Sequence, residues 1–418
     1  MKIRLSLLLI IICATATHVI AADPTATTYS WTDCQGSAKP YPAPTQAYDY
    51  PDTLTPVMIN HVGRHGARYP ATPRHTSTLL KALRLANEQG TITARGRELM
   101  ALTEKVVTYS DGRWGALDTL GMAEQRGIAS RMLANYPMLF GSNTVEAISS
   151  YSPRCIMSMY EFTHQLSRLD NKVELRTASG RKYSPLMRFF DGNPDYSTYR
   201  KSDTLAATID SYTRANVPLN ALYRVLGNKF SSDMSLPDVA MAEYSVLAGL
   251  QAMGLDCDIS RYLTPQEYNA LWGVFNLRQY LQHSTSTLSA IPSDIASPLL
   301  LDIIASTDGF ISGDNTSTVH LRFGHAETLM PLLALMHLPG CYYLTNYFDT
   351  VGMHWRDFQV VPMAANLQLI LFRSDSGRYY LRTDLNEEPV TLIPGDTSIY
   401  VPWTKARAYF DRCIPLYY

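Results

Sequence analysis

A histidine flanked by two arginines follows a short apolar run near the start of the chain. The run, residues 56–62, is followed closely by the sequence RHGARYP. A neutral imidazole can attack phosphorus, and guanidinium groups bind phosphoryl oxygens through paired hydrogen bonds. Donors already in place also stabilise the charge on a phosphoryl group during transfer. We therefore predict phosphoryl transfer to His65, with Arg64 and Arg68 binding the phosphate. Gly66 would let the backbone approach it.

Two later segments show the same order of strand, turn and helix. Residues 145–151 precede Ser-Pro and an apolar-periodic helix over 154–166. Residues 318–323 precede the sequence Gly-His-Ala-Glu and a helix over 328–337. Proline at a first helical position and glycine in a tight turn suit these boundaries. Because ligands bind outside the carboxyl ends of the strands in an open α/β sheet, we expect the three turns to meet at one edge.

The fold class that these elements predict is α/β. We expect a doubly wound, mainly parallel sheet flanked by helices, with an inserted, mostly helical cap domain. Helical patterns such as 265–283 fill the middle of the chain, and 366–373 alternates with 379–385 as in a hairpin. No Gly/Ser linker divides the chain. The predicted division is a core of residues 23–190 and 306–418, a cap of residues 191–305, and a surface-wrapping arm over about 23–50.

Composition and the N-terminus limit the class of protein. The chain is 46% hydrophobic and 17% charged, too apolar for disorder, and its net charge of −1 gives no basic field for nucleic acid or membrane surfaces. Residues 1–22 are predicted as a signal peptide: Lys2 and Arg4 precede an apolar run too short to span a bilayer, and Val19 and Ala21 fit the −3 and −1 positions. We expect an exported, periplasmic, extracellular or vesicle-associated protein without a later membrane helix.

Five cysteines remain after the predicted signal peptide, so at least one thiol stays unpaired. We predict a Cys257–Cys413 disulfide and a buried thiol at Cys155. The chain has no CxxC motif. His61 and His65 are four residues apart, but no cluster of further ligands accompanies them. We therefore expect neither a metal nor another cofactor.

The RHGARYP run is similar to the signature of the histidine acid phosphatases, in the branch that includes phytases. That family forms a phosphohistidine intermediate, so the resemblance implies that His65 is the nucleophile and that Arg64 and Arg68 bind phosphate. The sequence Ser-Pro-Arg-Cys around Arg154 resembles the family segment that supplies another phosphate-binding arginine. A helix N-terminus at this point also favours an anion.

The third turn resembles one subgroup of this family. Most members have His-Asp here, whereas His325-Ala-Glu327 is similar to the multiple inositol polyphosphate phosphatases. The resemblance implies that His325 binds phosphate and that Glu327 protonates the leaving oxygen, which an inositol alkoxide needs because it is a poor leaving group. It also implies phosphorylated inositols such as phytate as substrates. A broad-range acid phosphatase with the same site is the alternative.

Weaker matches extend over most of the remaining chain. Residues 117–121 with Gln125 resemble the family's LTxxG…Q segment, from which Asp118 departs. Residues 188–191 resemble a stretch of the inositol polyphosphatase group. The basic residues nearby are candidates for contacts to peripheral phosphates: Arg181, Lys182 and Arg188. A secreted binding protein with the same fold is the alternative from another class, and release of phosphate from a chromogenic ester in EDTA distinguishes the two.

Overall fold

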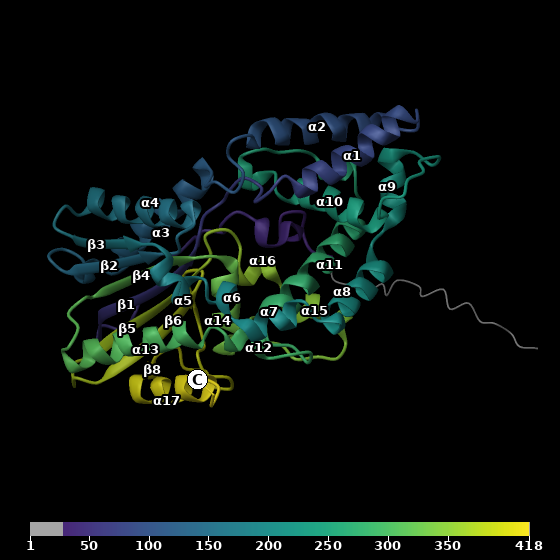
Figure 1. Ribbon diagram of the computed structural model, residues 1–418. Helices are drawn as coiled ribbons and strands as arrows, with labels where there is room; N and C mark the ends of the chain where they lie inside the picture. The colour runs from purple at the N-terminus through teal and green to yellow at the C-terminus, as the bar shows by residue number, and fades with distance from the viewer. Residues whose placement is uncertain (1–27, 418) are drawn as a thin grey trace, which may run out of the picture.

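One mixed β-sheet organises the protein (Figure 1), which a computed structural model describes over residues 28–417. The strands are β1 (Leu54–Arg64), β2 (Thr144–Ser149), β3 (Glu174–Ser179), β4 (Val319–Gly324), β5 (Asn366–Ser374), β6 (Tyr379–Leu385), β7 (Glu388–Val390) and β8 (Val401–Pro402). They are ordered β3-β2-β4-β1-β5-β6-β7, and β8 pairs with β6. The first four of this order run parallel to their neighbours, and the later strands pair antiparallel. The predicted α/β class is confirmed.

The strands predicted before the three turns are β1, β2 and β4, and the predicted hairpin is formed by β5 and β6. Their register places the ends of the three turn-bearing strands side by side. Arg64 pairs with Gly324 across β1 and β4, and Ser149 pairs with Phe323 across β2 and β4. The turns that follow these strands therefore lie at one edge of the sheet, as the sequence predicts.

Helices cover both faces of this sheet (Figure 1). Helices α3 (Thr119–Asn135) and α4 (Pro153–Leu169) pack on one face, and α13 (Ser297–Ser312), α14 (Ala326–Leu335) and α17 (Trp403–Cys413) pack on the other. Alternate residues of β1 supply the two cores, since Ile59 contributes to the first and Met58 to the second. The sheet is thus buried on both sides.

A second group of helices packs around its own hydrophobic cluster beside the sheet. It contains α1 (Arg74–Glu88), α2 (Ala94–Ser110), α9 (Leu219–Leu226), α10 (Leu236–Ala248) and part of α11 (Pro265–His283). Helix α8 (Asp203–Asn216) lies along α11. Helices α1 and α2 pack here although they fall within residues 23–190, which the sequence assigns to the core. Helix α11 joins the two parts, because Trp272 is buried in this cluster and Tyr280 in that of the sheet.

Short helices complete the structure. These are α5 (Ser184–Met187), α6 (Phe189–Gly192), α7 (Pro194–Arg200), α12 (Ile291–Asp294), α15 (Val351–His354), α16 (Asp357–Val360), and 3-10 turns at Asp33–Ala38, Pro137–Leu139, Arg181–Tyr183, Gln251–Met253, Ile259–Arg261 and Phe348–Thr350. The stretch Ile291–Ser312 meets the length and composition of a membrane span, contrary to the expectation that no later segment would. A buried core helix passes the same test, and Leu299 and Ile303 of α13 are buried in the sheet core.

The N-terminal segment is not simply a surface arm, which corrects the prediction. Its 3-10 turn is buried from Cys34 to Ser37. Gly36 has φ +59°, and a Cβ there would lie 2.7 Å from a carboxylate oxygen of Asp357. The backbone N–H of Ser37 donates to the same carboxylate at 2.7 Å. The turn is therefore anchored inside the protein. The predicted signal peptide, residues 1–22, lies outside the described residues.

The predicted Cys257–Cys413 disulfide is wrong. All five cysteines of the described chain are free. Cys257 packs against the helical cluster, whereas Cys413 ends α17 and packs against the sheet core. Spacing in the sequence does not determine which cysteines meet in space, and these two belong to different hydrophobic clusters. The prediction that Cys155 is a buried thiol is confirmed.

Candidate active site

His65 is the first residue after β1 and is almost completely buried. Its backbone is held on both sides: its N–H donates to the carbonyl of Gly324 at 3.1 Å, and its carbonyl accepts from the N–H of Ala364 at 3.1 Å. The end of β4 and the segment before β5 thus fix the position of the imidazole. Both contacts follow from the central place of β1 in the sheet.

The hydrogen bonding of His65 decides which ring nitrogen carries the proton. Nδ1 lies 2.9 Å from the carbonyl oxygen of Gly66. A carbonyl oxygen only accepts, so Nδ1 carries the proton and Nε2 keeps its lone pair. Burial, and after it the charge of Arg64, holds the pKa of His65 well below its usual value. The ring is therefore neutral, as attack on phosphorus requires.

Gly66 packs against α3, a contact that the sequence does not indicate, and its approach to the phosphate stays a prediction. A Cβ on Gly66 would lie 2.4 Å from the carbonyl oxygen of Gly121, and one on Gly121 would lie 2.2 Å from that of Ala67. The two glycines let the loop after β1 pack backbone to backbone on α3. Glu124 of α3 also accepts from the N–H of Ala67 at 2.7 Å. Burial raises the pKa of Glu124 to about 6.

Arg64 and Arg68 are buried on the wall of a cavity of about 250 Å³. Nη1 of Arg64 donates to the carbonyls of Ser37 at 2.6 Å and Val361 at 2.5 Å, and Nη1 of Arg68 donates to its neighbour Tyr69 at 2.9 Å. Nε of each guanidinium has no partner in the described structure. Burial lowers the pKa of Arg64 to about 10 and that of Arg68 to about 9. Burying a guanidinium charge without a partner is unfavourable, and an anion that accepts hydrogen bonds from the two arginines would offset that desolvation.

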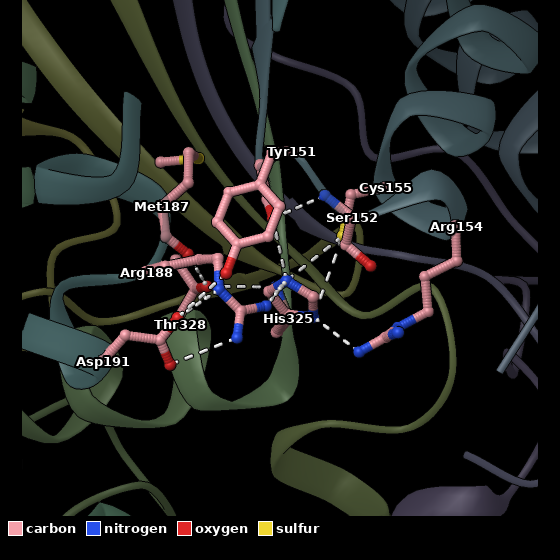
Figure 2. A network of polar contacts seen from close by, with 10 residues as sticks. Tyr151, Ser152, Arg154, Cys155, Met187, Arg188, Asp191, His325 and Thr328 are labelled. Carbon is pink, nitrogen blue, oxygen red and sulfur yellow. Dashed lines mark hydrogen bonds and ion pairs between the residues drawn. The ribbon is translucent and has the colours of Figure 1, made fainter. Parts of the chain in front are cut away.

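The turns after β2 and β4 bring Arg154 and His325 together (Figure 2). Arg154 is the second residue of α4, and its Nη2 lies 3.1 Å from Nδ1 of His325. The rings of His325 and His65 have centroids 5.7 Å apart. Arg154 also lies near enough to His65 for its charge to lower the pKa of that histidine. The three turns thus bring their histidine and arginine side chains together, as the sequence predicts.

Arg188 reaches the same histidine from the other side (Figure 2). Its Nη1 lies 2.8 Å from Nε2 of His325, and Asp191 holds the guanidinium through contacts of 2.6 and 3.1 Å. A neutral imidazole has one acceptor nitrogen, so it cannot accept from both Arg188 and Arg154. An anion between the two guanidinium groups could accept from both.

The other two basic candidates lie further out. The guanidinium carbon of Arg181 is 4.5 Å from the ring centroid of Tyr151, a ring that Arg188 also covers. Lys182 is exposed and lies over the ring of Tyr183, outside the cluster around His325. Contact of Arg181 or Lys182 with substrate stays a prediction.

Glu327 lies at the start of α14, on the wall of a second cavity of about 720 Å³. Phe275 lines both this cavity and the one at Arg64. Burial would raise the pKa of Glu327, but His283, His325 and Arg64 together lower it to about 2. The carboxylate of Glu327 is therefore ionised unless an anion offsets the charge of these neighbours. The cationic side chains on the wall are Arg188, Arg200, Lys201 and Arg278.

Several residues of this site were not predicted. His283, Arg200, Lys201 and Arg278 line the larger cavity. Ser150 Oγ lies 3.0 Å from Nε2 of His325. One signal was available for α11: Arg278 and Gln282 are polar residues four apart on a largely buried helix, a spacing that puts both on one face. Among the described residues, no group of three His, Cys, Asp or Glu side chains could hold a metal ion.

Comparison with known proteins gives relatives over most of the chain. No family model matches it. Multiple inositol polyphosphate phosphatase 1 of Homo sapiens is 26% identical over 353 residues, which cover 78% of this chain and 72% of that protein. The Gallus gallus protein of the same name is 25% identical over 374 residues, covering 81% and 78%. The chain is a homologue of the multiple inositol polyphosphate phosphatases.

Solved structures agree on the fold of this homologue of the inositol polyphosphate phosphatases. The multiple inositol polyphosphate phosphatase of Bifidobacterium longum, in complex with inositol hexasulfate, has a TM-score of 0.78 at 16% identity, covering 92% of this chain and 99% of that one. A phytase from D. castellii has a TM-score of 0.72 at 15% identity, covering 96% and 90%. The fold is that of the histidine acid phosphatases with a helical cap, as the sequence resemblance implies.

Proposed function

We propose that the protein is a phosphomonoesterase that hydrolyses inositol polyphosphates through a phosphohistidine on His65. Its homologues are phosphatases. The observation that carries the mechanism is the 2.9 Å contact between Nδ1 of His65 and the carbonyl oxygen of Gly66. Because that oxygen can only accept, the contact places the proton on Nδ1 and leaves the lone pair of Nε2 free to attack. No other buried imidazole of the described chain has two motif arginines beside it in the sequence.

In the first step Nε2 of His65 bonds to phosphorus while the bond from phosphorus to the inositol oxygen breaks. Arg64, Arg68 and Arg154 donate to the phosphoryl oxygens, and the charge that develops there meets donors already in place. Glu327 gives its proton to the leaving alkoxide. In the second step water attacks phosphorus, its proton passes to Glu327, and the N–P bond breaks.

The larger cavity supports a substrate with several phosphates. Four cationic side chains line it, whereas the acidic residues on its wall are Asp191 and Glu327. A ring that carries several phosphate groups complements this positive charge, whereas a monoester with one phosphate can contact only part of it. We expect kcat/KM for inositol hexakisphosphate to exceed that for nitrophenyl phosphate by at least about tenfold. Equal values would favour a broad-range acid phosphatase.

Trapping the intermediate tests the mechanism. Full-length protein is mixed with ³²P-labelled inositol hexakisphosphate and stopped in alkali, where phosphohistidine survives, and the label should appear in the peptide that contains His65. His65→Ala should carry no label and lose activity by about 10⁴-fold or more while unfolding at a similar temperature. Label on another residue, or appreciable turnover by the variant, would remove His65 from the mechanism.

We also propose that the protein is exported. The support is the N-terminal sequence alone, in which a basic start precedes a short apolar run and small residues. Expression of the full chain followed by N-terminal sequencing tests this. A mature protein that begins near residue 22 in the exported fraction is the expected result, and a retained protein that keeps residues 1–22 would contradict it.

A further inference from the structure

A buried carboxylate near Arg64 has no task in the mechanism above. Asp357 is the first residue of α16 and is completely buried. Its Oδ2 accepts from the backbone N–H of Ser37 at 2.7 Å, and its Oδ1 accepts from Nε1 of Trp272 at 2.9 Å. Burial raises the pKa of Asp357 to about 6, so the carboxylate is ionised at neutral pH. One ionised group thus joins the N-terminal segment, α11 and α16.

Asp357 also holds a second peptide group, through its own backbone. The N–H of Val361 donates to the carbonyl oxygen of Asp357 at 2.8 Å. The carbonyls of Ser37 and Val361 both accept from Nη1 of Arg64, at 2.6 and 2.5 Å. Ser37, Val361 and Arg64 are all buried. Each of the two carbonyls that hold Arg64 therefore belongs to a residue whose N–H is held by Asp357.

The two carbonyls determine which donors of Arg64 are left for an anion. Nη1 carries two protons, and each carbonyl takes one of them. The donors that remain are Nη2 and Nε, and Nε has no partner in the described structure. Nε and Nη2 form one side of the planar guanidinium, from which two parallel N–H bonds can reach two oxygens of one phosphate. The direction of this pair of donors follows from the places of the two carbonyls.

Gly36 lets the N-terminal 3-10 turn, Asp33–Ala38, come close enough for this contact. Its φ of +59° lies in the left-handed region, and a Cβ there would lie 2.7 Å from Oδ2 of Asp357 and 3.2 Å from Oδ1. Even an alanine at this position would push the turn and the carboxylate apart. The carbonyl of Ser37, in the next residue, would then lose its place beside Arg64.

We propose that Asp357 is a positioning residue for phosphoryl transfer, which directs Nε and Nη2 of Arg64 toward the phosphate through the carbonyls of Ser37 and Val361. The inference rests on the proposed function of the site. Asp357 acts through Arg64. Donors that are already oriented need no rearrangement when charge develops on the phosphoryl group, so the binding of phosphate and the rate of transfer should both depend on Asp357.

The test is Asp357→Ala in the full chain, with the dissociation constant of inorganic phosphate measured by calorimetry. The constant should rise by at least about fivefold, because the carbonyl of Ser37 is no longer held. Loss of a negative charge near Arg64 would by itself tighten the binding of an anion, so the sign of the change separates positioning from electrostatics. Tighter or unchanged binding of phosphate would overturn the inference.

The same variant should lose kcat/KM on two esters alike. Arg64 holds the phosphate that is transferred, which inositol hexakisphosphate and nitrophenyl phosphate have in common, so each should lose by about fivefold or more. A loss on inositol hexakisphosphate alone would place the effect on the outer phosphates and reject the role of Asp357.

Two variants of other residues make the test independent of the folding of Asp357→Ala. Gly36→Ala breaks the same contact from the other side without removing a charge, and should also weaken phosphate binding. Asn269→Ala is the matched control: its side chain accepts from the N–H of Tyr29 at 2.9 Å and donates to the carbonyl of Tyr29 at 3.1 Å, so it anchors the same N-terminal segment elsewhere. Asn269→Ala should lower the unfolding temperature but change the dissociation constant of phosphate by less than about twofold. Equal weakening in all three would assign the effect to attachment of the segment and reject the inference.

The outcomes separate this inference from the proposed function. If the wild-type protein releases no phosphate from either ester, the proposed function fails, and the calorimetric comparison still decides whether Asp357 governs phosphate binding. If the wild-type protein is active and neither Asp357→Ala nor Gly36→Ala weakens the binding of phosphate, only the positioning role fails.

Discussion

Gly66 and Gly121 pack backbone against backbone, and a Cβ on Gly66 would lie 2.4 Å from the carbonyl oxygen of Gly121. This contact joins the loop that carries His65 to the first turn of α3. The position of the imidazole therefore depends on a helix that does not itself reach the phosphate pocket. Two further bonds from α3 support the same loop: Gln125 donates to the carbonyl of Arg64 at 3.0 Å, and Glu124 accepts from Ala67.

Gly121→Ala should destabilise the protein by about 2 kcal/mol and lower kcat, because the added methyl group would lie 2.2 Å from the carbonyl oxygen of Ala67 and must push the loop away. Urea unfolding and phosphatase assays measure the two effects. Gly273→Ala is the matched control: it lies inside α11 with Tyr212 Oη at 3.8 Å as its nearest neighbour, and should be neutral or stabilising by up to about 1 kcal/mol. Gly121→Ala with unchanged stability would contradict the packing described.

Glu327→Gln should slow hydrolysis of inositol hexakisphosphate by roughly 10²–10⁴-fold, the usual contribution of a general acid. Nitrophenyl phosphate should lose far less, since nitrophenolate leaves with little protonation. Steady-state rates on both esters at one pH give the comparison. Equal losses on the two substrates would assign Glu327 a role in binding phosphate or in folding, and would leave the leaving group without its proposed acid.

Arg188→Ala should lower kcat/KM for inositol hexakisphosphate by roughly 10–100-fold, because it removes a charged donor 2.8 Å from the ring of His325. Arg181→Ala is the comparison from the same segment: its exposed guanidinium covers Tyr151 and forms no hydrogen bond with His325 in the described structure, so the expected loss is under about threefold. If both variants lose activity equally, the segment acts as a general basic surface.

His61→Leu should make the protein less sensitive to acid. Both ring nitrogens of His61 are buried without a partner between Phe162 and Phe323, and burial lowers its pKa to about 3. The unfolded chain binds a proton at this histidine below about pH 6.5, whereas the folded chain does not until about pH 3. Stability is therefore lost as the pH falls through that window, by roughly 2 kcal/mol between pH 7 and pH 5 from this group.

Urea unfolding at pH 7 and pH 5 measures that loss. The wild-type protein should lose about 2 kcal/mol more than the His61→Leu variant between the two values. Identical losses would mean that His61 is protonated in the folded state at pH 5, against the burial seen here.

The three turns after β1, β2 and β4 were predictable because each is a continuous signal of strand, turn and helix, and parallel strands must end at one edge. The packing of the helices around the site could not be predicted, because it depends on contacts between segments that are far apart in the sequence. Nothing local to His283 indicates that the end of α11 lines the same cavity as Glu327, and nothing local to α1 indicates that it packs on α10. The same reason explains the wrong Cys257–Cys413 pairing. The packing of Gly66 could not be predicted because its neighbour Gly121 lies in another element.

The position of β1 has a consequence for how the protein matures. Ile59 pairs with Val319 on one side and with Ile370 on the other, so the strand that leads to His65 finds its neighbours only when most of the chain has been made. Closing loops of this length is slow compared with forming local helices. A ribosome-bound or truncated chain that stops before β5 should therefore contain the whole RHGARYP motif and yet have no activity.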